Sequence, residues 1–218
     1  MGYKAVIFDL DGTLLDTIRD LADTVNEVLK ELDLDPHPIE AYKVFVGDGM
    51  KNLVLRALPE SLREEEALVE RALSRTRAVY SERWRLHTRP YPGIPRLLDE
   101  LSARKLHLAI LSNKPDPSTR DVVREMLPRW SFRAVLGERP WVPRKPHPAG
   151  ALEIAACLSL PVSDILYVGD TGTDMKTANA AGMFAVGALW GFRTARELLD
   201  NGARTLIEKP LDLLSLLP

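Results

Sequence analysis

FDLDGT occupies residues 8–13, directly after the apolar run AVI at 5–7. The run predicts a buried strand, and Asp9 and Asp11 stand at its end. Two carboxylates this close are costly beside a buried strand, because like charges raise each other's pKa. Successive side chains of a strand point to opposite faces, so residues two apart share a face. We therefore expect both carboxylates to point toward one ligand.

The rest of the chain alternates apolar runs with helical patterns. Strands are predicted at 4–8, 107–111, 133–136, 165–168, 184–188 and 205–208, and helices at 94–104, 118–127, 149–158 and 173–181. Continuously apolar strands separated by helices are typical of α/β proteins whose parallel sheet is covered on both faces. We therefore predict a Rossmann-like parallel sheet core.

Residues 16–88 interrupt this alternation, because they contain no convincing strand. Apolar residues recur at helical spacing over 16–32, and 63–84 has the pattern of one long charged helix. The segment RPYPG at 89–93 then marks the return to the α/β pattern. We predict a small all-α domain at 16–88, inserted after the first strand into a core of 1–15 and 89–218, with hinges near Asp16-Thr17 and 87–93.

The composition limits the possible partners. Of 218 residues, 45% are hydrophobic and 28% charged, and the net charge is −2, so non-specific nucleic-acid binding is not expected. No apolar run approaches the roughly 20 residues of a membrane span. The single cysteine, Cys157, favours a reducing, cytoplasmic location, and its apolar helical context predicts that it is buried. Monomer and homodimer both remain open.

Polar residues follow the predicted strands. In an open parallel sheet, ligands bind at the carboxyl ends of the strands, so these residues are expected to converge. They are Asp9, Asp11, Gly12 and Thr13 after the first strand, Ser112, Asn113 and Lys114 after the second, KPHP (145–148) beyond the third, and GDTGTD (169–174) after the fourth.

The charges of this set predict a metal site. Asp9, Asp11, Asp170 and Asp174 bring up to four negative charges, and Lys145 offsets one. A divalent cation supplies two more positive charges, and a few carboxylates plus water suit Mg²⁺ better than Ca²⁺.

Mg²⁺ bound in this way commonly shares its ligand shell with a substrate phosphate. A phosphate is held by backbone N–H groups, hydroxyls and a lysine. The chain offers that set in Gly12, Thr13, Ser112, Asn113 and Lys145.

Each motif alone also has a purely structural interpretation. DLDG fits an Asx-turn, SN fits a helix N-cap (although Ser118 or Thr119 could fill that position), KPHP fits a plain loop, and GDTGTD fits a turn with a cap. All four at predicted strand ends, in one order, favour a functional site.

The ordered set resembles the haloacid dehalogenase-like hydrolases over nearly the whole chain. FDLDGTLLDT, LSN, KPHP and YVGDTGTD match the four motifs of that family, and the helical insert resembles its small all-α cap. Within the family, the chain most resembles the phosphoglycolate phosphatase group. The supporting segments are VGDGMKNLV (46–54), PYPGIPRLLDEL (90–101), RKPHP (144–148) and AAGMFAVGALWGF (180–192).

The resemblance implies a role for each matching residue. Asp9 would be the nucleophile and a Mg²⁺ ligand, and Asp11 the general acid–base, with its backbone carbonyl on the metal. Asp170 would be a metal ligand, and Asp174 would orient the ligand shell of the metal or bind it through water. Ser112, Asn113 and Lys145 would hold the phosphoryl group, and Thr13 would hydrogen-bond near the aspartate pair.

The implied function is a Mg²⁺-dependent phosphatase for a small phosphomonoester, with phosphoglycolate as the leading substrate, acting through an aspartyl-phosphate. Gly47, Asp48 and Gly49 form a turn expected to contact the leaving group. Lys43, Lys51 and Arg56 are further candidates to meet a substrate carboxylate, although solvated surface is the simpler interpretation of each.

Several alternatives stay open. They are a nucleotide or pyrophosphate phosphatase, a phosphosugar mutase, a phosphonate hydrolase with Lys51 as Schiff base, and a non-catalytic regulator that binds a phosphorylated ligand. A regulator would be free to lose Asp9 or Lys145, and both are present.

Overall fold

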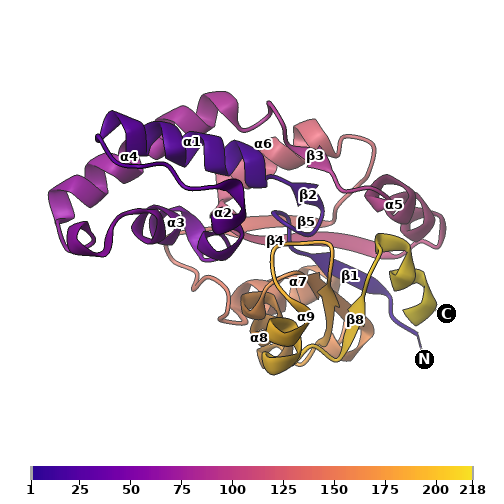
Figure 1. Ribbon diagram of the computed structural model, residues 1–218. Coiled ribbons are helices and arrows are strands. Elements are labelled where there is room, and N and C mark those ends of the chain that lie inside the picture. The colour runs from indigo at the N-terminus through magenta and orange to yellow at the C-terminus, as the bar shows by residue number, and fades with distance from the viewer. Residues whose placement is uncertain (1, 218) are drawn as a thin grey trace. The chain divides into compact units, whose positions relative to one another are not determined.

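The computed structural model describes residues 2–217 and divides into two compact units (Figure 1). The first, here called the core unit, consists of Met1–Leu15 and Pro90–Pro218. The second, here called the helical unit, is Asp16–Arg89. The chain therefore leaves the core unit after its first strand and returns to it once.

A six-stranded parallel sheet forms the centre of the core unit, as the sequence predicts. Its strand order is β5-β4-β1-β6-β7-β8. Phe8 at the end of β1 pairs with Ile110 of β4 on one side and Val168 of β6 on the other. The order reverses at β1, and in open parallel sheets ligands bind at the carboxyl ends of the strands at such a reversal. The strands are β1 (Ala5–Phe8), β4 (His107–Pro115), β5 (Ala134–Glu138), β6 (Ile165–Gly169), β7 (Phe184–Ala188) and β8 (Thr205–Ile207).

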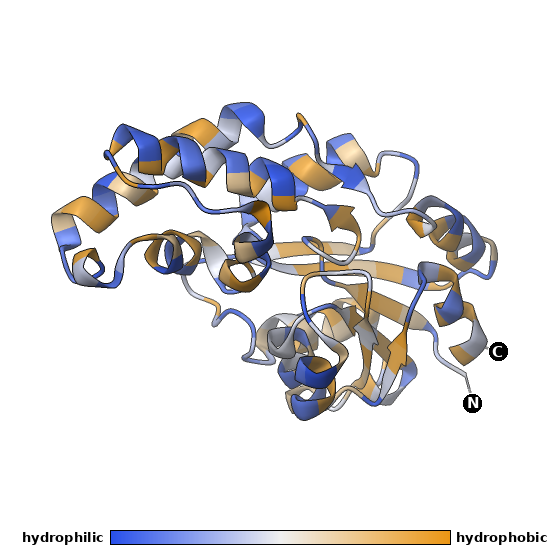
Figure 2. Cartoon of the chain, in the orientation of Figure 1, coloured by the Kyte–Doolittle hydropathy of each residue, from blue (hydrophilic) through white to orange (hydrophobic). Residues whose placement is uncertain are grey.

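Helices cover both faces of this sheet. Figure 1 shows α7, α8 and α9 on one side and α5 and α6 on the other. The apolar colouring of the strands in Figure 2 matches their burial, and β1 is buried at every residue. The helices are α5 (Ile94–Ala103), α6 (Asp116–Met126), α7 (Ala149–Leu158), α8 (Gly172–Ala180) and α9 (Ala195–Asp200), with 3-10 turns at η2 (Val162–Asp164) and η3 (Pro210–Leu216).

The helical unit contains α1 (Ile18–Glu31), α2 (Ile39–Phe45), α3 (Gly49–Ala57), the 3-10 turn η1 (Glu60–Leu62) and α4 (Glu66–Arg83). Helix α1 packs along α4, and α3 packs on both α2 and α4. The predicted long charged helix begins at Glu66 rather than at Arg63, because residues 63–65 form a turn after η1. The short strands β2 (Leu15–Asp16) and β3 (Arg89–Pro90) pair where the chain leaves and re-enters the core unit.

A buried carboxylate joins the two ends of the helical unit. Asp20, in the first turn of α1, accepts hydrogen bonds from the backbone N–H groups of His87 (3.0 Å) and Thr88 (2.8 Å). The Thr88 hydroxyl donates a further bond of 2.8 Å. Asp20 is 2% exposed. The segment that returns to the core unit is thereby fastened to the start of α1.

The expectation that Cys157 is buried was wrong, because its side chain is exposed. The buried residues of α7 are Gly150, Ala151, Ile154 and Ala155, and Cys157 lies outside this stripe. No helix in the described residues is both long and apolar enough to cross a membrane.

Candidate active site

Asp9 lies directly beyond β1, at the reversal of strand order. Its backbone N–H donates to the carbonyl of Val168 in β6 (2.9 Å), so the residue stays tied to the sheet. Its carboxylate Oδ1 accepts from the backbone N–H of Leu10 (2.7 Å). The sheet therefore fixes the position of a carboxylate whose side chain is only 9% exposed.

Asp170 follows β6 and is completely buried. The Thr13 hydroxyl donates to its Oδ1 (2.7 Å), and the backbone N–H of Phe192 donates to its Oδ2 (2.8 Å). The indole N–H of Trp190 donates to the Thr13 carbonyl (2.9 Å). The turn after β1 and the loop after β7 thus hold this carboxylate from two directions.

The limited space beside Asp170 explains why residue 12 is a glycine. Gly12 has a φ of +87°, and a Cβ added there would lie 2.3 Å from Oδ2 of Asp170. Only glycine combines this backbone conformation with such a close approach.

Asp174 is both a helix cap and a member of the site. The Thr171 hydroxyl at the N-cap of α8 accepts from the Asp174 N–H (3.3 Å), and the Thr171 N–H donates to Asp174 Oδ2 (3.1 Å). The Thr171 hydroxyl also donates to that oxygen (2.6 Å). The capping interpretation of this motif is therefore correct, and the cap holds the carboxylate in place.

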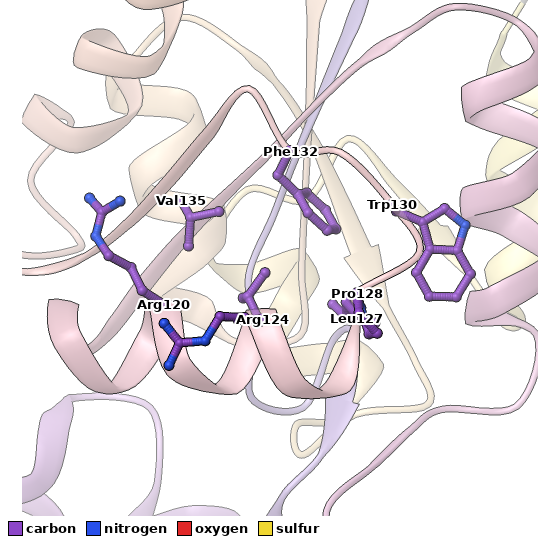
Figure 3. A pocket seen from close by; sticks show the side chains of 8 residues that line it. Arg120, Arg124, Leu127, Pro128, Trp130, Phe132 and Val135 are labelled. Atoms are coloured by element: carbon purple, nitrogen blue, oxygen red, sulfur yellow. The ribbon is translucent and has the colours of Figure 1, made fainter.

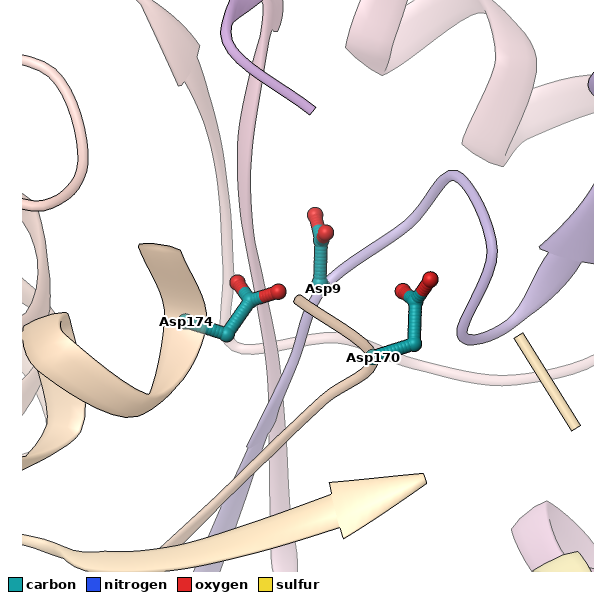
Figure 4. A group of neighbouring side chains, drawn as sticks. All are labelled: Asp9, Asp170 and Asp174. Carbon is teal, nitrogen blue, oxygen red and sulfur yellow. The ribbon is translucent and has the colours of Figure 1, made fainter. Parts of the chain in front are cut away.

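The three carboxylates come together, as Figure 4 shows. One oxygen of each of Asp9, Asp170 and Asp174 lies within 4.8 Å of the others. Burial, followed by the charge of Asp174, raises the pKa of Asp170 to about 7. Burial, followed by the same charge, raises the pKa of Asp9 well above its usual range. Carboxylate oxygens that are held together despite burial and mutual repulsion are suitable ligands for a hard divalent cation.

Lys145 lies among these carboxylates. Its Nζ donates to Asp9 Oδ1 (2.8 Å), to Asp174 Oδ1 (2.7 Å) and to the carbonyl of Leu111 (3.1 Å). Burial by itself would lower the pKa of this ammonium, but the charges of Asp174 and Asp9 outweigh it and raise the pKa above its usual value. Lys145 therefore stays charged at neutral pH.

Asn113 holds the backbone of Lys145. Its Oδ1 accepts from the Lys145 N–H (3.0 Å), and its Nδ2 donates to the Lys145 carbonyl (3.1 Å). Neighbouring Ser112 is buried, and its Oγ accepts from the backbone N–H of Lys114 (3.2 Å). The second and third motifs thus meet beside the carboxylates.

Asp11 has a partner in the structure that the sequence analysis did not assign to it. Lys114 Nζ donates to both carboxylate oxygens of Asp11, at 3.0 and 2.8 Å. The two side chains are 5% and 14% exposed. The available signal was the position of Lys114 at the same strand end as Ser112, and counting it would have given the four aspartates a second positive charge.

The remaining candidates belong to the helical unit. Gly47 and Gly49, with φ of 120° and 83°, flank Asp48, whose carboxylate pairs with Arg56. The Arg56 side chain also donates to the Phe45 carbonyl (3.0 Å). The two lysine candidates are paired as well: Lys43 with Glu40 (2.8 Å) and Lys51 with Glu70 (3.7 Å). All three cations have an acidic partner inside their own unit.

A separate groove of about 410 Å³ lies along α6 and β5 (Figure 3). Two arginines and apolar side chains line it, and no carboxylate does, so it lacks the ligands of a hard cation. The lining residues are Arg120, Val123, Arg124, Leu127, Pro128, Trp130, Phe132 and Val135.

Comparison with known proteins agrees with this geometry. Residues 6–188 match the family model described as haloacid dehalogenase-like hydrolase. The chain belongs to the haloacid dehalogenase-like hydrolases. A relative from Pseudomonas syringae pv. tomato named phosphoglycolate phosphatase is 33% identical over 99% of this chain and 79% of its own length.

Two solved structures share the fold of this haloacid dehalogenase-like hydrolase. A protein from Lactobacillus delbrueckii subsp. bulgaricus superposes with a TM-score of 0.93 at 31% identity, covering 100% of this chain and 99% of its own. A predicted phosphoglycolate phosphatase from Haemophilus somnus gives a TM-score of 0.89 at 26% identity, covering 98% and 97% of the two chains. The predicted family and α/β fold class are confirmed, and the protein is an enzyme of the hydrolase class.

Proposed function

We propose that this hydrolase is a Mg²⁺-dependent phosphatase for small phosphomonoesters, with phosphoglycolate as its leading substrate. The observation that carries the proposal is the buried cluster of Asp9, Asp170 and Asp174 with Lys145 among them. The names of the relatives at about a third identity support the choice of substrate. Phosphoryl transfer needs an arrangement of this kind, because it depends on positioning and charge stabilisation.

The metal would be held by the three clustered carboxylates, with the backbone carbonyl of Asp11 as a further oxygen ligand. When bound, Mg²⁺ supplies the positive charge that offsets repulsion between a carboxylate nucleophile and a phosphate dianion. Because Lys145 contacts both Asp9 and Asp174, it is placed to neutralise a phosphoryl oxygen beside the nucleophile.

Asp9 attacks phosphorus in the proposed reaction. A bond forms between its carboxylate oxygen and phosphorus, and the bond from phosphorus to the ester oxygen breaks. Asp11 donates a proton to that departing oxygen. It then takes a proton from the water that attacks the phosphoaspartate, which frees Asp9 and inorganic phosphate.

Neighbouring residues hold the phosphoryl group during both steps. The Ser112 hydroxyl and Lys145 bind its oxygens, together with backbone N–H groups at Gly12 and Thr13. Asn113 acts mainly by fixing the Lys145 backbone, to which both ends of its amide are bonded.

The helical unit acts as a cap that excludes water while substrate is bound. The Gly47-Asp48-Gly49 turn is its proposed point of contact with the leaving group. This assignment depends on the sequence motif and on the two positive φ angles that shape the turn.

A phosphate-release screen tests the proposal. The purified chain is assayed with and without Mg²⁺ on phosphoglycolate, sugar phosphates, nucleotides and pyrophosphate. We expect Mg²⁺-dependent release that is fastest with phosphoglycolate and is abolished by a chelator. Fastest release from nucleotides or pyrophosphate would reassign the substrate, conversion of a sugar phosphate to its isomer would indicate a mutase, and no release at all would refute a phosphatase.

A further inference from the structure

Lys114 is a buried cation whose position is fixed through its backbone. Its N–H donates to the Ser112 hydroxyl, and its carbonyl accepts from the Thr119 hydroxyl (3.0 Å). It lies near the end of β4, where the pairing of β4 with β5 shifts register between Leu111 and Pro115. This irregular strand end presents the ammonium to Asp11.

Lys114 pairs with Asp11, the residue that the proposed reaction uses as general acid and base. Both oxygens of Asp11 contact the ammonium, yet the proposed reaction requires an Asp11 oxygen at the ester oxygen of the substrate. At least one of these contacts must therefore open for Asp11 to reach the leaving group. A second anion that takes over the ammonium would make this opening favourable, because Lys114 would not be left buried without a charged partner.

A carboxylate on the leaving group can be that anion. In phosphoglycolate a single methylene separates the ester oxygen from the carboxylate, so the residues that contact these two groups must be neighbours. Asp11 and Lys114 are neighbours. The other site lysine, Lys145, is already bonded to two carboxylates and a carbonyl.

We propose that Lys114 is the specificity-determining residue that recognises an anionic leaving group, exchanging the carboxylate of Asp11 for that of the substrate. The inference rests on the proposed function and deepens it. A neutral leaving group offers no replacement, so Asp11 must then give up an ion pair to reach the ester oxygen. The substrate class is thus small phosphomonoesters with a carboxylate close to the ester oxygen.

The test is a cycle that changes the lysine and the substrate carboxylate separately and together. Wild type and Lys114→Met are each assayed on phosphoglycolate and on its neutral amide, which has nearly the same shape. Each single change is expected to lower kcat/KM by about 100-fold, as for truncation of one partner in a buried charge pair. The double change should cost little more than either alone, because both remove the same contact.

Controls separate this role from a structural one. Lys114→Arg keeps a cation and should keep most of the preference for the carboxylate, and Lys176→Met, an exposed lysine on α8, should behave as wild type. Circular dichroism checks that Lys114→Met is folded, and if it is not, Lys114→Arg is taken through the same cycle, in which the amide should still be the poorer substrate.

Two results would overturn the inference while leaving the proposed function intact. One is that the losses from the two single changes multiply when Lys114→Met acts on the amide. The other is that wild type hydrolyses phosphoglycolate and its amide equally well. The proposed function fails separately, if wild type releases phosphate from no phosphomonoester.

Discussion

Gly12 shows how little space surrounds the buried carboxylates. A methyl group there would meet Asp170 Oδ2 at 2.3 Å. We expect Gly12→Ala to lower Mg²⁺-dependent turnover by about 100-fold, since misplacing a reacting group by about 1 Å has that effect. The matched control is Gly182→Ala, which also has a positive φ but whose added Cβ would contact only Val162, at 3.4 Å. Steady-state kinetics compares the two, and equal losses would show that backbone strain rather than Asp170 is responsible.

Asp9 is the residue whose removal has the most specific consequence. Asp9→Asn keeps a side chain of similar size but removes the proposed nucleophile, so turnover should fall by about 10⁴-fold or more. No acid-stable phosphoenzyme should appear in mass spectra of rapidly quenched reactions. Asp121→Asn, an exposed change on α6, should leave both measurements unaltered. Phosphoenzyme in the Asp9 variant would exclude Asp9 as the attacking group.

Asp20 fastens the end of the helical unit to α1. Asp20→Ala would leave the N–H group of His87 and the buried N–H and hydroxyl groups of Thr88 without their acceptor, and we expect a loss of about 3 kcal/mol in the free energy of unfolding. Asp23→Ala changes an exposed carboxylate on the same helix and should cost under about 0.5 kcal/mol. Urea denaturation measures both, and similar midpoints would show that the Asp20 contacts contribute little.

The elements predicted from the sequence were those defined by burial. Six apolar runs became the six strands, because a parallel sheet covered on both faces requires continuous apolar sequence. Helices α2 and α3 were missed, since their seven and nine residues leave little helical periodicity to recognise. Helix α9 was also missed, although Thr194 and Glu197 carry a capping signature and Thr194 does cap it.

Part of the candidate site could be predicted from the sequence, and part of it could not. The gathering of Asp9, Asp170 and Asp174 follows from strand ends that share one edge of a sheet, so topology alone predicts it. Lys114 could be placed at this edge of the sheet from its position after a strand, but its pairing with Asp11 could not be predicted, because it depends on the irregular end of β4. Side-chain direction at such an irregularity is set by tertiary packing rather than by strand periodicity.

For the whole molecule, the charge cluster links stability to pH and metal. The pKa of Asp170 is about 7 in the folded protein against 3.8 for the ordinary group, so the folded state binds its proton more tightly than the unfolded state. Stability from this group is full below about pH 4 and declines as the pH rises toward 7. Mg²⁺ bound at the proposed site would compete with that proton and would replace its effect once the carboxylate ionises.

We therefore expect Mg²⁺ to raise the melting temperature more at pH 8 than at pH 5.5. Differential scanning calorimetry with and without Mg²⁺ at the two pH values measures this, and Asp170→Asn should remove most of the difference. An equal rise at both values would mean that the clustered carboxylates do not bind the ion.

Trp190 gives this enzyme a built-in optical probe. Its indole N–H bonds the carbonyl of Thr13, and the hydroxyl of Thr13 bonds Asp170, so a fluorophore lies two hydrogen bonds from the carboxylate cluster. Any cation that reorganises Asp170 changes the polarity around that ring. The emission of Trp190, isolated by replacing the other three tryptophans with phenylalanine, can therefore follow occupancy of the centre in real time and without a substrate.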